Sequence, residues 1–145
     1  MMIVERAPTD TELVALLDAA FAELVARYGP EGRSGVHADA RFLVAVVDRV
    51  AVGCGAVQPG DGATGELKRM YVDPRHRGRG VARSLLKALE ELAVELGYDR
   101  MRLATGVRQP EAVALYESSG YERTALYGRY VDQPLTLCYA KNLVM

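Results

Sequence analysis

The sequence predicts a mixed α/β domain of three layers, in which helices cover both faces of a central β-sheet. In two segments, apolar residues recur at the period of a helix. Between these segments lie short runs rich in Val, Ile, Leu and Tyr, with glycines and prolines at their ends. The chain has 145 residues, which is the size of one ordinary domain with its own core. We therefore expect a single domain over residues 1–145.

The N-terminal half predicts one helix and a meander of strands. A strand is expected over 2–7, followed by a helix. The helix begins with a capping box formed by Thr9 and Glu12, and it ends at Gly29-Pro30. The apolar stripe of this helix is Leu13, Leu16, Leu17, Ala20, Phe21, Leu24 and Tyr28. A loop and three strands are then expected over 29–40, 41–48, 50–57 and 66–74.

The C-terminal half predicts two strand–helix units and a closing pair of strands. The strongest helix runs from Val81 to Leu96 and ends at Gly97, a natural C-terminal cap. A second helix begins near Pro110 and closes at Gly120. The remaining strands are expected over 100–106, from Tyr121, and over 134–143.

Composition excludes several classes of protein. The formal net charge of −1 and the pI near 6.1 argue against a domain built around nucleic acid. No apolar run reaches the roughly 18 residues that span a bilayer, and the N-terminus has no charged start followed by an apolar stretch. Cys54 and Cys138 are expected to be buried free thiols. We therefore expect a cytoplasmic protein without a metal site, a membrane partner or a nucleic-acid partner.

A basic, glycine-containing stretch, RHRGRGVAR (75–83), lies between the end of a predicted strand and the start of the strongest helix. A helix N-terminus presents unpaired N–H groups to anions. Gly78 and Gly80 permit positive φ and a close approach of the backbone, and Arg77 and Arg79 add positive charge. The stretch therefore predicts a pyrophosphate cradle. The alternative is a solvated basic loop for nucleic acid, but aromatic residues do not interleave with these arginines.

Two motifs carry a resemblance to a known family. Arg75-x-x-Gly78-x-Gly80-Val81-Ala82, after Val72-Asp73-Pro74, resembles the acyl-CoA loop of the GCN5-related N-acetyltransferases (GNAT). GVRQPEAVALYESSGY (106–121) resembles the later strand–helix element of that family. The motifs follow the expected order, and the pattern of elements covers nearly the whole chain. One departure is Gln109, where the family often has Asn.

The resemblance implies a mixed, splayed sheet and transfer of an acetyl group from acetyl-CoA to an amine by direct attack in a ternary complex. The strand over 66–72 would splay from the strand near 100–105 and admit the pantetheine arm. A backbone N–H near Val72 would polarise the thioester carbonyl. The residues that the resemblance assigns to cofactor binding are Met70, Tyr71, Val72, Arg77, Gly78, Arg79, Gly80, Val81, Ala82, Gln109 and Tyr116.

The reaction needs two proton transfers, and the resemblance suggests a residue for each. Tyr116 matches the tyrosine that the family places near the cofactor sulfur, where it would act as the acid. The alternative is that Tyr116 is an aromatic core residue. Glu66 is the candidate base, acting through a water. Its alternative is a solvent-facing carboxylate paired with Lys68, with ordered water alone as the base.

The acceptor is expected to be a small-molecule or peptide amine, bound by loops on the rigid scaffold. One candidate loop is 29–40, with Arg33 and His37. The other is 126–134, with Tyr127, Arg129, Tyr130 and Asp132. A non-catalytic acyl-CoA sensor of the same fold is the alternative function. Dimers are frequent in the family, so the resemblance leaves a homodimer open.

Overall fold

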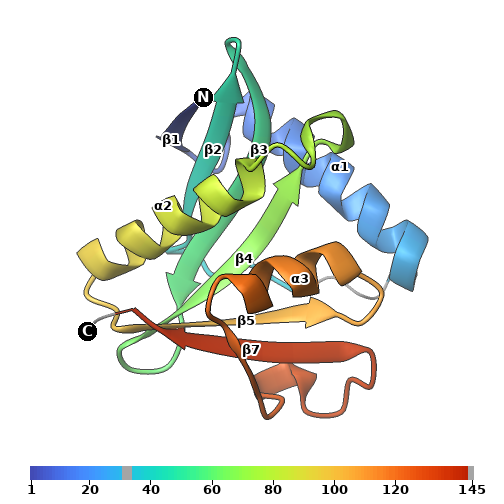
Figure 1. Cartoon of the computed structure of the whole chain (residues 1–145), viewed down its shortest axis with the longest axis vertical. Coiled ribbons are helices and arrows are strands. Elements are labelled where there is room, and N and C mark those ends of the chain that lie inside the picture. The colour runs from blue at the N-terminus through green and yellow to red at the C-terminus, as the bar shows by residue number, and fades with distance from the viewer. Residues whose placement is uncertain (31–33, 144–145) are drawn as a thin grey trace.

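The computed structural model describes residues 1–30 and 34–143, which form one seven-stranded sheet with helices on both faces (Figure 1). The strand order is β1-β2-β3-β4-β5-β7-β6. The elements are β1 (Met2–Arg6), α1 (Thr11–Tyr28), β2 (Arg41–Val47), β3 (Val50–Pro59), β4 (Thr64–Val72), the 3₁₀ turn η1 (Pro74–His76), α2 (Val81–Glu95), β5 (Arg100–Gly106), α3 (Pro110–Ser118), β6 (Glu122–Thr124), the 3₁₀ turn η2 (Gly128–Tyr130) and β7 (Thr136–Asn142).

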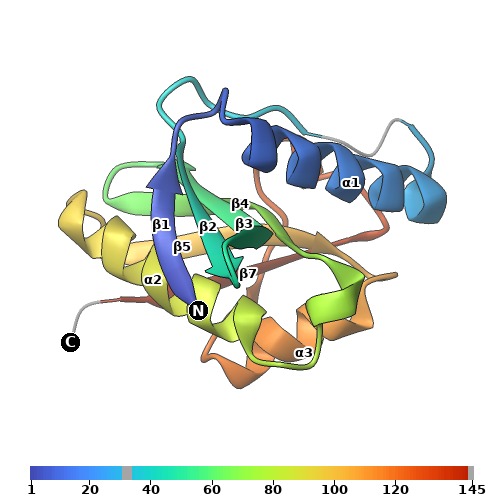
Figure 2. The same ribbon diagram turned by 90° about the horizontal axis from the view of Figure 1, so that it is seen from above.

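The helices and the sheet form three layers, as predicted. Helix α1 covers one face of the sheet, and α2 and α3 cover the other (Figure 2). Leu85 and Leu89 of α2 pack with Tyr116 of α3 and with inward residues of β3, β4, β5 and β7. On the opposite face, Leu13 and Leu16 of α1 pack against a second cluster from β2 and β3. Both predicted helical stripes therefore supply core residues.

The sheet is mixed because β4 and β5 run parallel, whereas the other strand pairs in the described ranges are antiparallel. Pairing between β4 and β5 is confined to Thr64–Glu66 on one side and Arg100–Arg102 on the other. Beyond Glu66 the two strands diverge (Figure 1). This divergence confirms the splay that the family resemblance implied.

A bulge in β4 lies within its diverging part. The register with β3 shifts between Cys54 and Ala56, so that three steps along β4 oppose two along β3. Arg69, inside the shifted segment, has a φ of 60°, which is uncommon for a residue other than glycine. Because a bulge bends its strand and increases its twist, it contributes to turning β4 away from β5.

Several predicted element boundaries differ from the structure by one or two residues, and the start of α1 and the end of β4 are two of them. Helix α1 is capped by Asp10, whose carboxylate accepts a hydrogen bond from the Leu13 amide at 3.0 Å, and not by Thr9. Glu12 does not complete a capping box, because its carboxylate accepts from the Ala51 amide of β3 at 2.9 Å. Strand β4 ends at Val72 and does not extend to residue 74.

Both cysteines are buried free thiols, as predicted. Burial raises the pKa of Cys54 to about 12, so this thiol stays protonated and unreactive at neutral pH. Among the described residues, no cluster of His, Cys, Asp and Glu could hold a metal ion. None of the helices in residues 1–30 and 34–143 is long and apolar enough to cross a membrane.

Candidate active site

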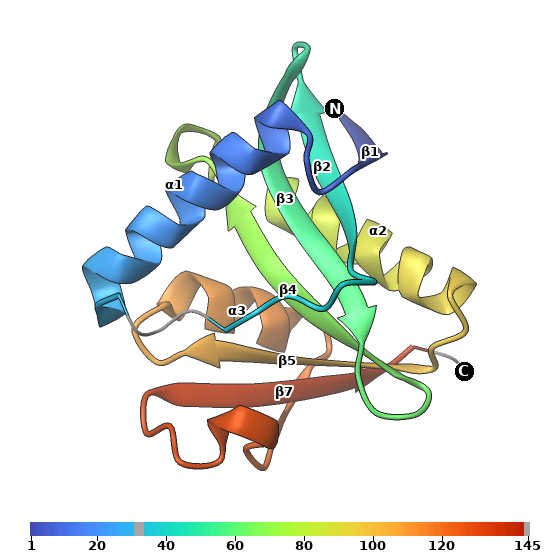
Figure 3. The ribbon, with the colours of Figure 1, turned by 180° about the vertical axis from the view of Figure 1, so that it is seen from behind.

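A cleft of about 710 Å³ opens where β4 and β5 diverge. Its lining residues come from α1, β4, the segment from η1 to the start of α2, β5, α3 and the segment 130–136. Figure 3 shows how these elements are arranged around β4 and β5. The predicted cofactor-binding residues that line it are Met70, Tyr71, Val72, Arg77, Gly78, Gly80, Val81, Ala82, Gln109 and Tyr116. Arg79, also predicted, is exposed and is not among the lining residues. The structure thus brings two distant motifs together around one space.

One end of the cleft is the N-terminus of α2, where free backbone N–H groups can bind an anion. Gly80 is the N-cap residue, with a φ of 82° in the left-handed region, and no side chain caps the helix. Gly78 has a φ of 77°, and a Cβ added at Gly78 or Gly80 would meet no atom within 4 Å. The first N–H groups of α2 therefore face an open space without a competing side-chain acceptor.

The Arg77 side chain joins the end of β4 to α1. Its Nε donates to the Val72 carbonyl oxygen at 2.9 Å, and its Nη2 donates to Glu23 Oε2 at 2.7 Å. The guanidinium also lies 5.5 Å from the centre of the Tyr71 ring. Sequence reasoning assigned its charge to phosphate, whereas the structure places that charge beside a carboxylate of α1.

The last turn of α1 bridges the far side of the cleft, a contact that sequence reasoning missed. Arg27 Nη1 donates to Glu111 of α3 at 2.8 Å, and the Tyr28 hydroxyl accepts from the Arg108 amide at 2.8 Å. Helix α1 thereby contacts Arg77, through Glu23, and the start of α3, through Arg27. A helical stripe indicates only which face is buried, so it carried no signal for these polar contacts.

Tyr116 lies in the cleft wall and in the core at once. It is 6% exposed, and its ring packs edge-on against Tyr121 with the ring centres 5.8 Å apart. Burial raises the pKa of Tyr116, so its hydroxyl stays protonated at neutral pH. Tyr116 is therefore packed as an aromatic core residue and also lines the cleft.

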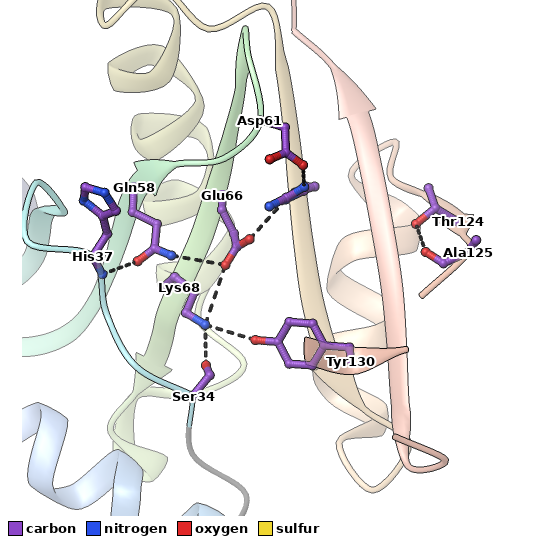
Figure 4. Close-up of polar contacts among 10 residues, drawn as sticks. Ser34, His37, Gln58, Asp61, Glu66, Lys68, Thr124, Ala125 and Tyr130 are labelled. Atoms are coloured by element: carbon purple, nitrogen blue, oxygen red, sulfur yellow. Dashed lines mark hydrogen bonds and ion pairs between the residues drawn. The ribbon is translucent and has the colours of Figure 1, made fainter. Parts of the chain in front are cut away.

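Glu66 lies in a smaller hollow of about 220 Å³ beside the cleft. Its carboxylate accepts from Gln58 Nε2 at 3.2 Å and from Arg102 Nε at 3.1 Å, and Lys68 Nζ lies 3.7 Å away (Figure 4). Glu66 is only 6% exposed, so it is not the solvent-facing carboxylate of the alternative interpretation. The expected pairing with Lys68 is present, and Arg102 adds a second cation.

Lys68 forms a polar bridge between the hollow and the cleft. Its ammonium group donates to Ser34 Oγ and, at 3.1 Å, to the Tyr130 hydroxyl (Figure 4). Ser34, Lys68 and Tyr130 line both spaces. The two spaces are therefore adjacent, with this bridge at their border.

The two predicted acceptor loops both reach the hollow. Tyr127, Arg129 and Tyr130 of the loop over 126–134 line it, whereas Asp132 does not. In the loop over 29–40, Ser34 and Gly35 line the hollow, the His37 amide donates to Gln58 at 2.9 Å, and Arg33 lies outside the described residues.

Arg102 and Gln58 are site residues that sequence reasoning missed. The available signal for Arg102 was the alternation of β5, where a charged side chain lies between the buried residues Met101 and Leu103. Gln58 gave no comparable signal, because it lies near the end of β3 beside a turn. Its role depends on the register that pairs it with Glu66 across β3 and β4.

Comparison with known proteins identifies the family. The sequence model of the Acetyltransferase (GNAT) family matches residues 8–121. The chain is 41% identical over 106 residues to an IAA acetyltransferase of Azospirillum brasilense, a match that covers 72% of this chain and 69% of that protein.

Solved structures agree with this family. A crystal structure from Klebsiella pneumoniae, provisionally assigned as an acyl-CoA N-acyltransferase, is 34% identical with a TM-score of 0.86 and covers 98% of this chain and 97% of that one. A GNAT acetyltransferase from Elizabethkingia anophelis with acetyl-CoA bound shares the fold at 18% identity, with a TM-score of 0.75 and 97% of each chain covered. The chain belongs to the GNAT family of acetyltransferases and is an acyltransferase enzyme.

Proposed function

We propose that this enzyme transfers an acetyl group from acetyl-CoA to the amine of a small molecule or peptide, by direct attack within a ternary complex. One observation carries the proposal: the cleft between the splayed strands β4 and β5 ends at the uncapped N-terminus of α2. This shape suits a ligand with a pyrophosphate at one end and a narrow, amide-containing arm.

The residues around the cleft fit acetyl-CoA. The backbone over Met70–Val72 has no partner in β5, so its edge can pair with the amides of a pantetheine arm. The amides of Arg77 to Ala82, opened by Gly78 and Gly80, would hold the pyrophosphate. Gln109 lines the cleft at the N-cap of α3 and would contact the arm. When bound, acetyl-CoA supplies the activated thioester.

We assign proton donation to Tyr116. Its hydroxyl is protonated at neutral pH and the residue lines the cleft, although burial raises its pKa and so makes it a weaker acid than an ordinary tyrosine. A protonated hydroxyl can donate a hydrogen bond to the departing thiolate and pass its proton to the sulfur, which becomes a neutral thiol, and the tyrosine then regains a proton from solvent. Since thiolates are good leaving groups, we expect this contribution to be moderate.

We assign removal of the amine proton to Glu66, acting through a water. The carboxylate lies next to the Lys68–Tyr130 bridge, at the border between the hollow and the cleft. Gln58 and Arg102 fix its orientation through hydrogen bonds. Ordered water acting without Glu66 is the competing assignment. The pH dependence of turnover in the variant Glu66→Gln separates the two.

The proposal is tested first by thermal unfolding with and without acetyl-CoA, and then by thiol release with a panel of amines. A ligand at about 100 times its Kd that binds only the folded state stabilises it by roughly 2.7 kcal/mol, so the melting temperature should rise clearly. Amine-dependent thiol release would establish catalysis. A thermal shift without any release would instead indicate an acyl-CoA sensor. Absence of a shift at saturating ligand would refute the cleft assignment.

A further inference from the structure

We propose that the Arg83 side chain binds the ribose phosphate of CoA, so that the enzyme prefers CoA to dephospho-CoA, which lacks this phosphate. The inference rests on the proposed binding of acetyl-CoA in the cleft, and it adds a contact that sequence reasoning did not assign. Three features of Arg83 support it: its position in the cleft, its hydrogen bonds to α3, and the absence of a paired carboxylate among the residues that the structure describes.

Arg83 is the last arginine of the basic stretch 75–83 and the third residue of α2. Its side chain is exposed, and it lines the cleft together with Gly78 and Gly80. A cation is unfavourable in the first turn of a helix, where the helix dipole is positive, and the first turn of α2 has no acidic residue to offset it. An anionic ligand in this part of the cleft would supply the missing negative charge.

Neutral groups hold the Arg83 guanidinium between α2 and α3. Its Nη2 donates to Ser118 Oγ at 3.0 Å, and its Nη1 donates to Ser119 Oγ at 3.4 Å. The Ser118 hydroxyl in turn donates to the Leu115 carbonyl oxygen at 3.0 Å, so its lone pairs remain for the arginine. These contacts position the guanidinium across two helices of the cleft without supplying a negative charge.

The carboxylates around the cleft have other partners. Arg77 also lines the cleft, but its guanidinium lies 2.7 Å from the carboxylate of Glu23. Glu117 of α3 accepts from the Tyr139 hydroxyl of β7 at 2.8 Å. Within residues 1–30 and 34–143, no carboxylate forms an ion pair with Arg83. Arg83 therefore differs from Arg77, because its charge is available to a ligand.

The chemistry of CoA indicates which phosphate this arginine takes. CoA carries a pyrophosphate next to the pantetheine arm and a separate phosphate monoester on its ribose. The proposed function assigns the pyrophosphate to backbone amides of residues 77–82, which leaves the ribose phosphate for a side chain. A phosphate monoester carries about 1.5 to 2 negative charges at pH 7 and three acceptor oxygens. The parallel N–H groups of a guanidinium match such oxygens in both charge and geometry.

The inference is tested by isothermal titration calorimetry of the full chain with CoA and with dephospho-CoA. The wild type should bind CoA about five- to tenfold more tightly at low salt, which is the range expected for an exposed, charge-assisted contact. The difference should shrink as salt rises. Arg83→Gln should bind CoA as weakly as dephospho-CoA and should bind dephospho-CoA as the wild type does.

Two further variants separate the contact from a general effect of charge. Arg83→Lys keeps the charge but loses the paired N–H groups, so it should keep only part of the preference for CoA. Lys87→Gln removes an exposed cation from the next turn of α2 that does not line the cleft, and it should keep the full preference. The melting temperature of each variant without ligand establishes that it is folded.

The two ligands also separate this inference from the proposed function. If the wild type binds both equally, acetyl-CoA binding stands and the ribose phosphate contact is rejected. If Arg83→Gln weakens both ligands by the same factor, Arg83 contacts the pyrophosphate and the inference is wrong. If neither ligand binds, the assignment of the cleft to acetyl-CoA fails, and this inference fails with it.

Discussion

The guanidinium of Arg77 lies 2.7 Å from the carboxylate of Glu23, which joins the end of β4 to α1 beside the N-terminus of α2. Glu23 also pairs with Arg27 on its own helix at 3.2 Å. A carboxylate thus stands near the proposed phosphate site and holds an arginine of the binding motif. The ion pair stabilises the cleft wall, but its carboxylate also lowers the positive electrostatic potential that would attract the phosphates of the ligand.

Glu23→Gln should therefore strengthen acetyl-CoA binding. The variant removes a negative charge and releases Arg77, so we expect a gain of about two- to fivefold at low salt, which corresponds to the worth of a partly exposed ion pair. The gain should shrink as salt rises, because screening weakens interactions between exposed charges. Asp18→Asn removes an exposed carboxylate from the same helix and is the control. Weaker binding in Glu23→Gln would mean that the pair preorganises the site.

Gly80→Glu should reduce acetyl-CoA affinity at least tenfold, because it adds bulk and a negative charge at the anion site of α2. Gly97→Glu is the matched control at the other end of the helix. Gly97 has a φ of 94° and open space around a built Cβ, so the backbone strain is similar without a nearby ligand. The acetyl-CoA affinity of each variant is measured by isothermal titration calorimetry. Equal losses in the two variants would attribute the effect to helix stability.

Tyr116→Phe should lower kcat roughly tenfold and leave the KM for acetyl-CoA unchanged, because only the donated proton is lost. Tyr121→Phe is the control, since its ring contacts that of Tyr116 and its hydroxyl donates to Glu90 at 2.8 Å. That variant should lose about 1–2 kcal/mol of unfolding free energy without a change in kcat. Steady-state kinetics and denaturant unfolding provide both readouts. An unchanged kcat in Tyr116→Phe would leave this tyrosine a packing role only.

Glu66→Gln should lower turnover most at acidic pH, where a larger fraction of the acceptor amine is protonated and a base is needed. Its loss also leaves Lys68 and Arg102 without their buried counter-charge, so the unfolding free energy should fall by about 3 kcal/mol. Rates should therefore be compared well below the melting temperature. Asp61→Asn, which removes the exposed partner of Arg102, is the control. A constant ratio to wild type across pH would assign the proton to ordered water.

Asp73 should make stability depend on pH in the acid range. Hydrogen bonds from the Arg75 guanidinium and amide lower the pKa of Asp73 to about 2, from an ordinary value of 3.8. The carboxyl group of Asp73 ionises more readily in the folded state than in the unfolded state. Its contribution to the free energy of unfolding is therefore complete above about pH 4 and is lost as the pH falls towards 2. The melting temperature of Asp73→Asn should thus lie below that of wild type at pH 6, and the difference should vanish near pH 2. A difference independent of pH would contradict this origin.

The elements and the uncapped, glycine-flanked start of α2 could be predicted because they depend on neighbouring residues. The stripe of α2, the proline after β4, and Gly78 and Gly80 act over a few positions, so their pattern is visible in the sequence. Boundaries were less exact, as Asp10 and Thr9 are both good N-caps and only the packing of the helix selects between them. The splay of β4 from β5 came from the family resemblance and not from the pattern of either strand.

The sequence by itself thus determined the order of helices and strands, the buried faces and the open N-terminus at the start of α2. Only the tertiary structure decided that Glu66 meets Arg102, and that Arg77 meets Glu23. Each pair joins segments far apart in the chain, and strand register and helix docking bring them together. The hollow beside Lys68 has the same origin, because its walls come from separate loops and strands whose charges add up only after folding.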